Sequence, residues 1–180
     1  MIDRWLEDGV IRPASRAGET PRIVFIASES HRSAHEIDFD RFGEFAEFGT
    51  RESMRHYGLS KLAMCTLASE LSRRLNPRES VEVAVHAMCP GGVATDISRD
   101  TPLLLKPLVG PLLRRFFQAP HEAIGPVIYL CCAEDAGTAT GIYLHMMQRK
   151  PVSRAASDPA NGARLWEASE TLVAKSRELR

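Results

Sequence analysis

The 180-residue sequence lacks an excess of charge of either sign, a long apolar run and any clustered cysteine motif. Lys and Arg together number 23, as do Asp and Glu, so there is no basic field to indicate a nucleic-acid partner. Charged residues interrupt the apolar runs near the N-terminus, a pattern unlike a signal peptide. No stretch approaches the roughly 20 apolar residues of a membrane-spanning helix. With 44% hydrophobic residues, the composition is that of a globular protein with a sizeable core.

Metal-ligand and disulfide patterns are missing as well. The four cysteines, Cys65, Cys89, Cys131 and Cys132, show no Cys-x-x-Cys spacing. We expect them to be reduced, mostly buried thiols, which indicates a cytoplasmic compartment. The six histidines are scattered along the chain, so the sequence predicts no metal site.

Short apolar runs alternate with longer helical segments. Strands are predicted at 22–27, 81–88 and 141–146, and helices at about 51–75, 120–134 and 158–176, with loops at about 9–21, 28–50 and 151–157. The first strand is continuously apolar, which predicts burial on both faces and a neighbour on each side. Helices between short strands imply parallel pairing with right-handed crossovers. The class is therefore α/β, but three strands are fewer than a doubly wound domain normally has.

One predicted helix holds a tyrosine and a lysine four positions apart, Tyr57 and Lys61. Residues at i and i+4 are neighbours on a helix surface, so the two side chains share nearly the same face. An ammonium beside a phenol favours the phenolate, which helps the phenol to exchange a proton with an alcohol or carbonyl oxygen at neutral pH. Two polar residues on a solvated helix face are the simpler interpretation, and the spacing alone does not decide between them.

Two further features follow the ends of predicted strands. RIVFIASES ends in hydroxyls at Ser28 and Ser30, which suit either a bond to a substrate oxygen or capping of their own loop. The next strand ends in Pro90, Gly91 and Gly92, which suit either a tight turn or a close approach to a flat ligand. Ligands of open α/β sheets bind beyond the carboxyl ends of the strands. The serine, the Tyr-x-x-x-Lys pair and the Pro-Gly turn are therefore expected at one edge of one sheet.

A family resemblance rests on three segments that occur in order, RIVFIASESH, YGLSK and CPGGVATDI. They resemble the short-chain dehydrogenase/reductase family, and SESHR, IDFDRF and RLWEASETLV are most similar to its retinol dehydrogenase-like and WW-domain-oxidoreductase-like branch. The resemblance covers the chain from about Arg22 to Val173. It implies a Rossmann-like fold and an NAD(P)-dependent oxidoreductase that interconverts an alcohol and a carbonyl by hydride transfer.

The resemblance also implies a role for each candidate residue. Tyr57 is expected to be the general acid/base, assisted by Lys61, which also holds the nicotinamide ribose hydroxyls. Ser28 is expected to orient and polarise the substrate oxygen, with Ser30 as the weaker candidate. The nicotinamide is expected to be lined by Pro90, Gly91, Gly92, Val93 and Thr95. The expected cofactor is NADP(H) or NAD(H), with NADP(H) slightly favoured.

The N-terminal half of the family's nucleotide site has no counterpart here. The family opens with a strand and a glycine-rich turn that cradles the pyrophosphate, whereas Gly137 and Gly141 precede their strand. The only asparagines, Asn76 and Asn161, match neither the family's Asn-Asn-Ala-Gly segment nor its catalytic asparagine. We therefore expect the C-terminal part of a doubly wound parallel sheet, without the N-terminal dinucleotide-binding strands. Three explanations stay open: a fragment of a full enzyme, a truncated inactive relative, and a sheet completed by another chain.

The most apolar segment, at about 96–118, follows the Pro-Gly turn. In the family this position covers the substrate, and an apolar lid suits a lipophilic alcohol or carbonyl compound. A peripheral membrane contact and a core helix stay open as alternatives. We expect residues 1–180 to form one partial Rossmann-like domain with a helical tail at about 151–180. A homodimer through the Tyr-bearing helix is a further expectation, and a noncatalytic binding or dimerisation module is the rival function.

Overall fold

The structure is a computed structural model that describes residues 2–45, 47–93, 119, 121 and 123–178. Its elements in chain order are α1 (Ile2–Glu7), α2 (Ala14–Ala17), β1 (Arg22–Ile26), the 3-10 helix η1 (Glu29–Arg32), α3 (Thr50–Leu75), β2 (Ala84–Cys89), α5 (Gly125–Cys132), α6 (Glu134–Gly137), β3 (Tyr143–His145), β4 (Gln148–Arg149), α7 (Arg154–Ser157) and α8 (Pro159–Glu178). Thr95 and the expected lid at about 96–118 lie outside the described residues.

The strands form one sheet in the order β1-β2-β3-β4. β1 pairs with β2 and β2 with β3 in parallel, whereas β4 pairs with β3 in the antiparallel direction. The predicted α/β class with three parallel strands is therefore confirmed. β4 is an addition to the prediction, because its two exposed polar residues are too few to give an alternating pattern.

β1 is an edge strand in the part of the sheet that the structure describes. Ile26 at its end is 55% exposed, whereas every residue of β2 is buried. The continuous apolar run of β1 predicted burial on both faces and a strand on each side. For the described residues this expectation is wrong, because β1 is only partly buried and β2 alone lies beside it.

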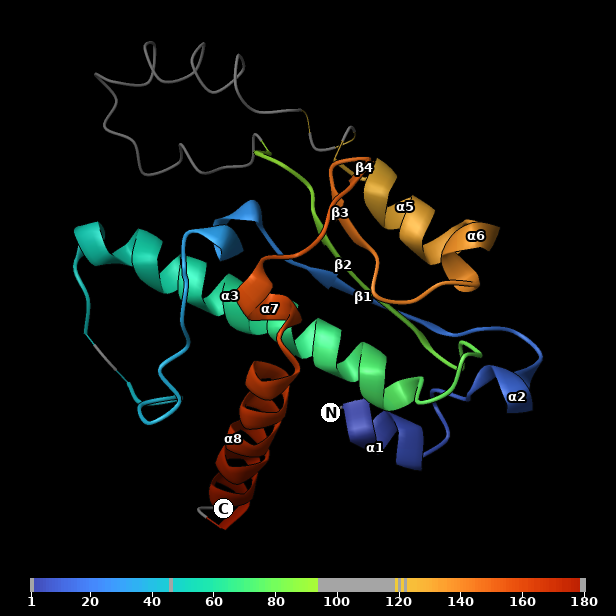
Figure 1. Ribbon diagram of the computed structural model, residues 1–180, viewed down its shortest axis with the longest axis horizontal. Coiled ribbons are helices and arrows are strands. Elements are labelled where there is room, and N and C mark those ends of the chain that lie inside the picture. The colour runs from blue at the N-terminus through green and yellow to red at the C-terminus, as the bar shows by residue number, and fades with distance from the viewer. Residues whose placement is uncertain (1, 46, 94–118, 120, 122, 179–180) are drawn as a thin grey trace.

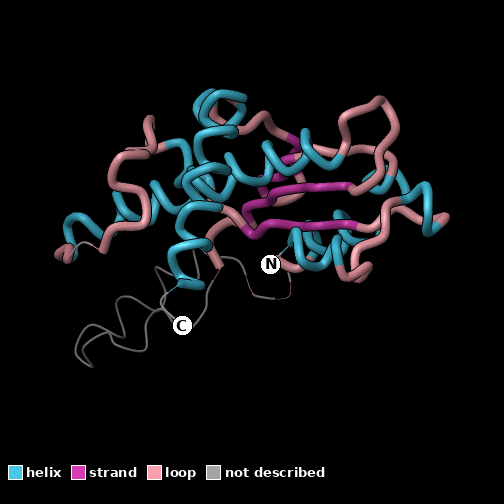
Figure 2. Tube along the Cα trace, turned by 90° about the horizontal axis from the view of Figure 1, so that it is seen from below, coloured by secondary structure: helices cyan, strands magenta, loops and turns pink. Residues whose placement is uncertain are grey.

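Helices cover both faces of the sheet, and in Figure 1 the strands run between α3 on one side and α5 and α6 on the other (Figures 1 and 2). Side chains alternate across a strand, so neighbouring residues of β2 enter different cores. Val85 packs with Leu62 and Cys65 of α3, and Met88 packs with Leu130 of α5. All five are fully buried. Full burial of each leucine contributes about 1.5–3 kcal/mol to folding.

α3 begins within one residue of its predicted start and ends where the sequence predicts. Pro77 disfavours a helical conformation at Asn76, which has φ −130° and ψ 65°. The Asn76 side-chain amide donates to the carbonyls of Ser72 and Val83 at 2.8 and 2.9 Å. This residue therefore ends the helix and fixes its last turn to the chain that enters β2.

Three predicted loops contain short helices, and one predicted helix is broken. α2 lies within 9–21, η1 within 28–50 and α7 within 151–157. Helices of four residues are too short to show a periodic apolar pattern. The helix expected at about 120–134 is observed as α5 and α6, because Ala133 between them has an extended backbone with ψ 138°.

The four cysteines are free thiols, but they divide evenly between core and surface. Cys65 and Cys89 are buried, whereas Cys131 and Cys132 are exposed at the end of α5. The expectation of mostly buried cysteines is therefore wrong for the adjacent pair. The two residues are exposed because they lie at the end of α5 and do not face a core.

Neither a membrane span nor a metal cluster is found in the described part of the chain. None of its helices is both long enough and apolar enough to cross a membrane. Its His, Cys, Asp and Glu side chains form no group of three or more that could hold a metal ion.

Candidate active site

Tyr57 and Lys61 lie one turn apart on α3, as their spacing predicts. The Lys61 Nζ is 5.6 Å from the centroid of the Tyr57 ring, and it donates a hydrogen bond to the carbonyl of Ile26 at 3.1 Å. Ile26 is the last residue of β1, so the lysine connects the helix to the carboxyl end of that strand. Tyr57 is 43% exposed, and no described residue hydrogen-bonds its hydroxyl.

Ser28 follows β1 directly and begins η1. Its Oγ accepts a hydrogen bond from the Ser30 backbone N–H at 3.2 Å, so Ser28 is the N-cap of this short helix. Its hydroxyl also donates a hydrogen bond to the Ser30 hydroxyl at 3.1 Å. A serine hydroxyl carries one donor hydrogen and two acceptor lone pairs. Capping uses a lone pair, so a bond to a substrate oxygen is compatible with capping once the Ser28 hydrogen turns from the Ser30 hydroxyl to that oxygen.

Gly58 brings α3 and η1 into close contact. A Cβ at this buried position would lie 2.6 Å from the Ser33 Oγ and 3.0 Å from the Ser30 carbonyl oxygen. Only a residue without a side chain permits this approach. Because Gly58 is the neighbour of Tyr57, it sets the distance between the turn that holds the tyrosine and the turn that holds the serines.

The Pro-Gly turn emerges from β2 beside these groups. β1 and β2 are parallel with Ile26 opposite Met88, so the turn after β2 and the serines after β1 leave the sheet at the same edge. Gly91 has φ +85°, a left-handed conformation in which a side chain is strained. Pro90, Gly92 and Val93 complete this turn, whereas Thr95 lies outside the described residues.

Two residues next to the serine carry interactions that sequence reasoning missed. Glu29 accepts a hydrogen bond from the Tyr143 hydroxyl at 2.9 Å and one from Arg32 Nε at 3.2 Å. Partial burial opposes its ionisation, but these two bonds prevail and keep the pKa of the Glu29 carboxyl below its ordinary value. His31 is fully buried. No sequence pattern indicated either role, because both are polar residues in a segment without periodicity.

Tyr143 of β3 both packs in the core and hydrogen-bonds. Its side chain is buried, and its ring meets the His31 ring edge-on at 5.2 Å between centroids. Burial, together with the bond to the Glu29 carboxylate, raises the pKa of the Tyr143 phenol far above its ordinary value. This tyrosine therefore stays protonated and acts as a hydrogen-bond donor to the residue that follows Ser28.

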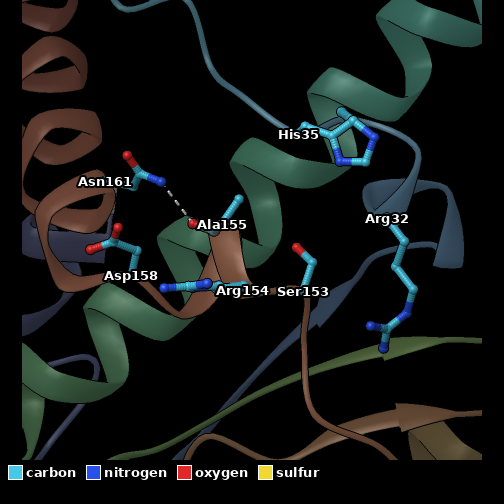
Figure 3. A pocket seen from close by; sticks show the side chains of 8 residues that line it. Arg32, His35, Ser153, Arg154, Ala155, Asp158 and Asn161 are labelled. Carbon is cyan, nitrogen blue, oxygen red and sulfur yellow. Dashed lines mark hydrogen bonds between the residues drawn. The ribbon is translucent and has the colours of Figure 1, made fainter.

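Two surface cavities adjoin the described fold, and neither is lined by Ser28, Tyr57 or Lys61. The first, of about 330 Å³, lies between the chain after η1 and the start of α8. Figure 3 labels seven of its lining residues, Arg32, His35, Ser153, Arg154, Ala155, Asp158 and Asn161. The second, of about 680 Å³, lies between the chain entering β1 and the α5–α6 region. The candidate site therefore lies at the carboxyl edge of the sheet and not in either of these two cavities.

The residues at this edge fit the nicotinamide end of a dinucleotide. The left-handed Gly91 and the exposed Gly92 leave backbone without side chains beside Ser28's strand, which suits a flat ring. The Lys61 ammonium is a donor for hydroxyls. A glycine-rich strand-to-helix turn for the pyrophosphate is not found among the described elements. The described part of this edge thus offers backbone without side chains and one ammonium donor.

Comparisons with known proteins agree with this geometry. No protein-family model matches the sequence. The chain is 31% identical to retinol dehydrogenase 14 of Mus musculus over 154 residues, which are 84% of this chain and 44% of that protein. It is 31% identical to dehydrogenase/reductase SDR family member 13 of Homo sapiens over 173 residues, 96% of this chain and 45% of that protein. It is 29% identical to the WW domain-containing oxidoreductase of Danio rerio, over 91% of this chain and 40% of that protein.

A solved structure shows the same fold. An uncharacterised protein from Mycobacterium paratuberculosis superposes with a TM-score of 0.55 at 22% identity, over 85% of this chain and 50% of that one. The chain spans a little under half the length of the curated relatives that it matches. On the strength of these relatives, the chain belongs to the short-chain dehydrogenase/reductase family.

Proposed function

We propose that this chain carries the catalytic portion of an NAD(P)-dependent oxidoreductase that interconverts an alcohol and a carbonyl on a lipophilic small molecule. The observation that carries the proposal is the meeting of α3 with the carboxyl end of β1. There Lys61 bonds to Ile26, and Gly58 packs on Ser30 and Ser33, in η1 and directly after it. The relatives are named dehydrogenases or reductases, one of them for retinol, which supports a lipophilic substrate.

In carbonyl reduction, bound NAD(P)H would supply the hydride that forms the new C–H bond at the carbonyl carbon. The Tyr57 hydroxyl gives its proton to the carbonyl oxygen as negative charge develops there. The Lys61 ammonium, beside the ring, stabilises the phenolate that remains. The Ser28 hydroxyl turns its hydrogen from the Ser30 Oγ to the same substrate oxygen, while its own oxygen stays bonded to the Ser30 N–H. Alcohol oxidation reverses each proton movement.

Tyr57→Phe tests the acid/base role. The variant keeps the ring that Lys61 contacts and removes a hydroxyl that has no partner among the described residues, so stability should change by less than about 0.5 kcal/mol. Turnover should fall by about 100-fold or more. The assay uses the product of the full open reading frame containing this chain, with lipophilic alcohols and aldehydes and both nucleotides. Retained turnover would remove Tyr57 from the role.

Nucleotide binding by this chain alone provides a second test. We expect it to be weak, because the backbone cradle for the pyrophosphate, with its helix N-terminus, is not among the described elements. A fluorescence titration with NADPH measures it. A dissociation constant in the micromolar range would contradict this expectation, because it would show that the described residues bind the nucleotide without that cradle.

A noncatalytic dimerisation module is the second candidate. Apolar side chains are exposed before and on the first turns of α3, with Phe45 at 89% and Met54 at 66%, and exposed apolar patches often mark interfaces. Met54→Lys should then dissociate a dimer in sedimentation velocity. A dimer sensitive to this change, together with no turnover on any substrate of the panel, would favour the module over the enzyme.

A further inference from the structure

His31 has two hydrogen bonds that lead in opposite directions. It is fully buried. Its Nδ1 lies 2.7 Å from the Ser28 carbonyl oxygen, and its Nε2 lies 3.1 Å from the Ser153 backbone nitrogen. A carbonyl only accepts and an amide N–H only donates, so the ring must carry its hydrogen on Nδ1 and accept at Nε2. His31 is therefore a neutral imidazole in one defined tautomer.

Burial supports the neutral form. It lowers the pKa of His31 below the ordinary value, although the bond to the Ser28 carbonyl opposes this effect. A proton on Nε2 would also face the Ser153 N–H, which is a donor. Both considerations keep the acceptor at Nε2 available, so the connection between Ser28 and Ser153 persists at neutral pH.

The same C-terminal segment holds η1 at two further points. The Tyr143 hydroxyl donates to Glu29 at 2.9 Å, and Arg32 Nη2 donates to the Pro151 carbonyl at 2.6 Å. These contacts fix the body of the short helix. Only His31, among these side chains, bonds to the backbone of Ser28 itself.

We propose that His31 is a positioning residue for the Ser28 hydroxyl. It holds the Ser28 peptide group against residues 143–153. The proposal rests on the proposed function, because it gives Ser28 the substrate oxygen as its target. The Ser28 carbonyl accepts from the His31 backbone N–H at 3.1 Å as well as from the His31 ring, and only the ring ties it to Ser153. With the Oγ held by the Ser30 N–H, both the backbone and the side-chain rotamer of the serine are determined. A loosened Ser28 would place its O–H away from the reacting oxygen.

Two substitutions separate the two bonds. His31→Asn keeps a donor near the Nδ1 position for the Ser28 carbonyl, and His31→Gln keeps an acceptor near the Nε2 position for the Ser153 N–H. His35→Asn, an exposed histidine of the same segment, is the matched control. In the full open reading frame product, each His31 variant should lower kcat about 10-fold or more, since small misplacements of reacting groups are costly. KM for the nucleotide should change less than twofold, as should kcat of His35→Asn.

A double-mutant cycle with Ser28→Ala shows whether His31 acts through the serine. With the hydroxyl removed, His31→Asn should lower kcat by less than twofold further, because the positioned group is gone. If the same 10-fold loss appears in the Ser28→Ala background, the positioning proposal is overturned. This outcome differs from failure of the proposed function, in which Tyr57→Phe keeps full turnover or the wild-type protein has none.

NMR spectroscopy decides the structural half of the proposal without turnover. Histidine ring nitrogens should show the Nδ1–H tautomer for His31. The Ser30 amide signal, which reports the bond to the Ser28 Oγ, should shift in His31→Gln and not in His35→Asn. An unmoved Ser30 amide, or the opposite tautomer, would overturn the proposal whatever the kinetics show.

Discussion

Gly58→Ala offers the sharpest test of how the site is assembled. The added Cβ would lie 3.0 Å from the Ser30 carbonyl oxygen, whereas ordinary contacts begin at 3.4 Å, so α3 and η1 must separate by about 0.4 Å (3.4 − 3.0). It would also lie 2.6 Å from the Ser33 Oγ. That side chain can rotate away, but only by giving up its 2.7 Å hydrogen bond to the Ser30 carbonyl.

Stability and activity should respond differently to this change. Alanine is better than glycine inside a helix by about 1 kcal/mol, and loss of the Ser33 hydrogen bond costs about 1 kcal/mol. The free energy of unfolding should therefore stay within about 1 kcal/mol of the wild type. A misplacement of about 1 Å costs roughly 100-fold in rate, so a separation of about 0.4 Å should lower kcat roughly 5- to 10-fold.

The assay compares kcat and the urea midpoint of Gly58→Ala with those of Gly49→Ala. Gly49 precedes the same helix, has a φ of −83° and has no atom within 4 Å of an added Cβ, so its substitution should leave kcat within twofold. The reasoning is refuted if Gly58→Ala keeps wild-type kcat while remaining folded. A large loss of stability would instead show that η1 cannot move and that the backbone contact is rigid.

Three further predictions concern stability and thiol chemistry. Burial lowers the pKa values of His31 and His86, so below about pH 6.5 the unfolded chain takes up protons that the folded chain does not. The free energy of unfolding, measured with urea, should therefore fall between pH 6.5 and 5 by up to about 1.4 kcal/mol per pH unit for each histidine. A free energy of unfolding that does not change over this range would contradict the prediction. Asn76→Ala should lower the free energy of unfolding in urea by about 2 kcal/mol, because Val83 loses both of its hydrogen bonds to that side chain. A cost below about 0.5 kcal/mol would show that water replaces the amide. Ellman's reagent should label Cys131 and Cys132 in the folded protein and Cys65 only on unfolding. Cys65 is buried, and burial raises its pKa to about 12. Rapid reaction of Cys65 would show that α3 opens readily.

Sequence reasoning succeeded where a local pattern decides the structure. α3 has a long apolar period, a proline two positions beyond its end and Tyr57 and Lys61 at helical spacing, so its bounds and the face shared by the pair follow from the chain itself. β1 and β2 are apolar runs of ordinary strand length. Because both run parallel, the hydroxyls after one and the Pro-Gly turn after the other were bound to share an edge.

It failed where a residue's environment comes from distant parts of the chain. The acceptor role of His31 depends on Ser153, 122 positions away, and that of Glu29 on Tyr143, 114 positions away. Neither pair follows a periodic pattern. The position of Gly58 could have been noticed, because a glycine inside a helix costs about 1 kcal/mol and usually has a packing reason. The residue that it packs against could not be predicted from a sequence pattern.

The turn that holds Ser28 and Ser30 is contacted from two sides, and substitutions on the two sides should have different effects. From α3, Gly58 sets how near the tyrosine's helix comes to Ser30. From the C-terminal segment, His31 sets how Ser28 is turned. Substituting Gly58 moves Tyr57 and Ser28 apart and should weaken both groups, so its effect should persist in part when Ser28 is alanine. Substituting His31 affects only the serine, so its effect should vanish there. Residues 143–153 thus belong to the candidate active site, although none of them is expected to touch the substrate.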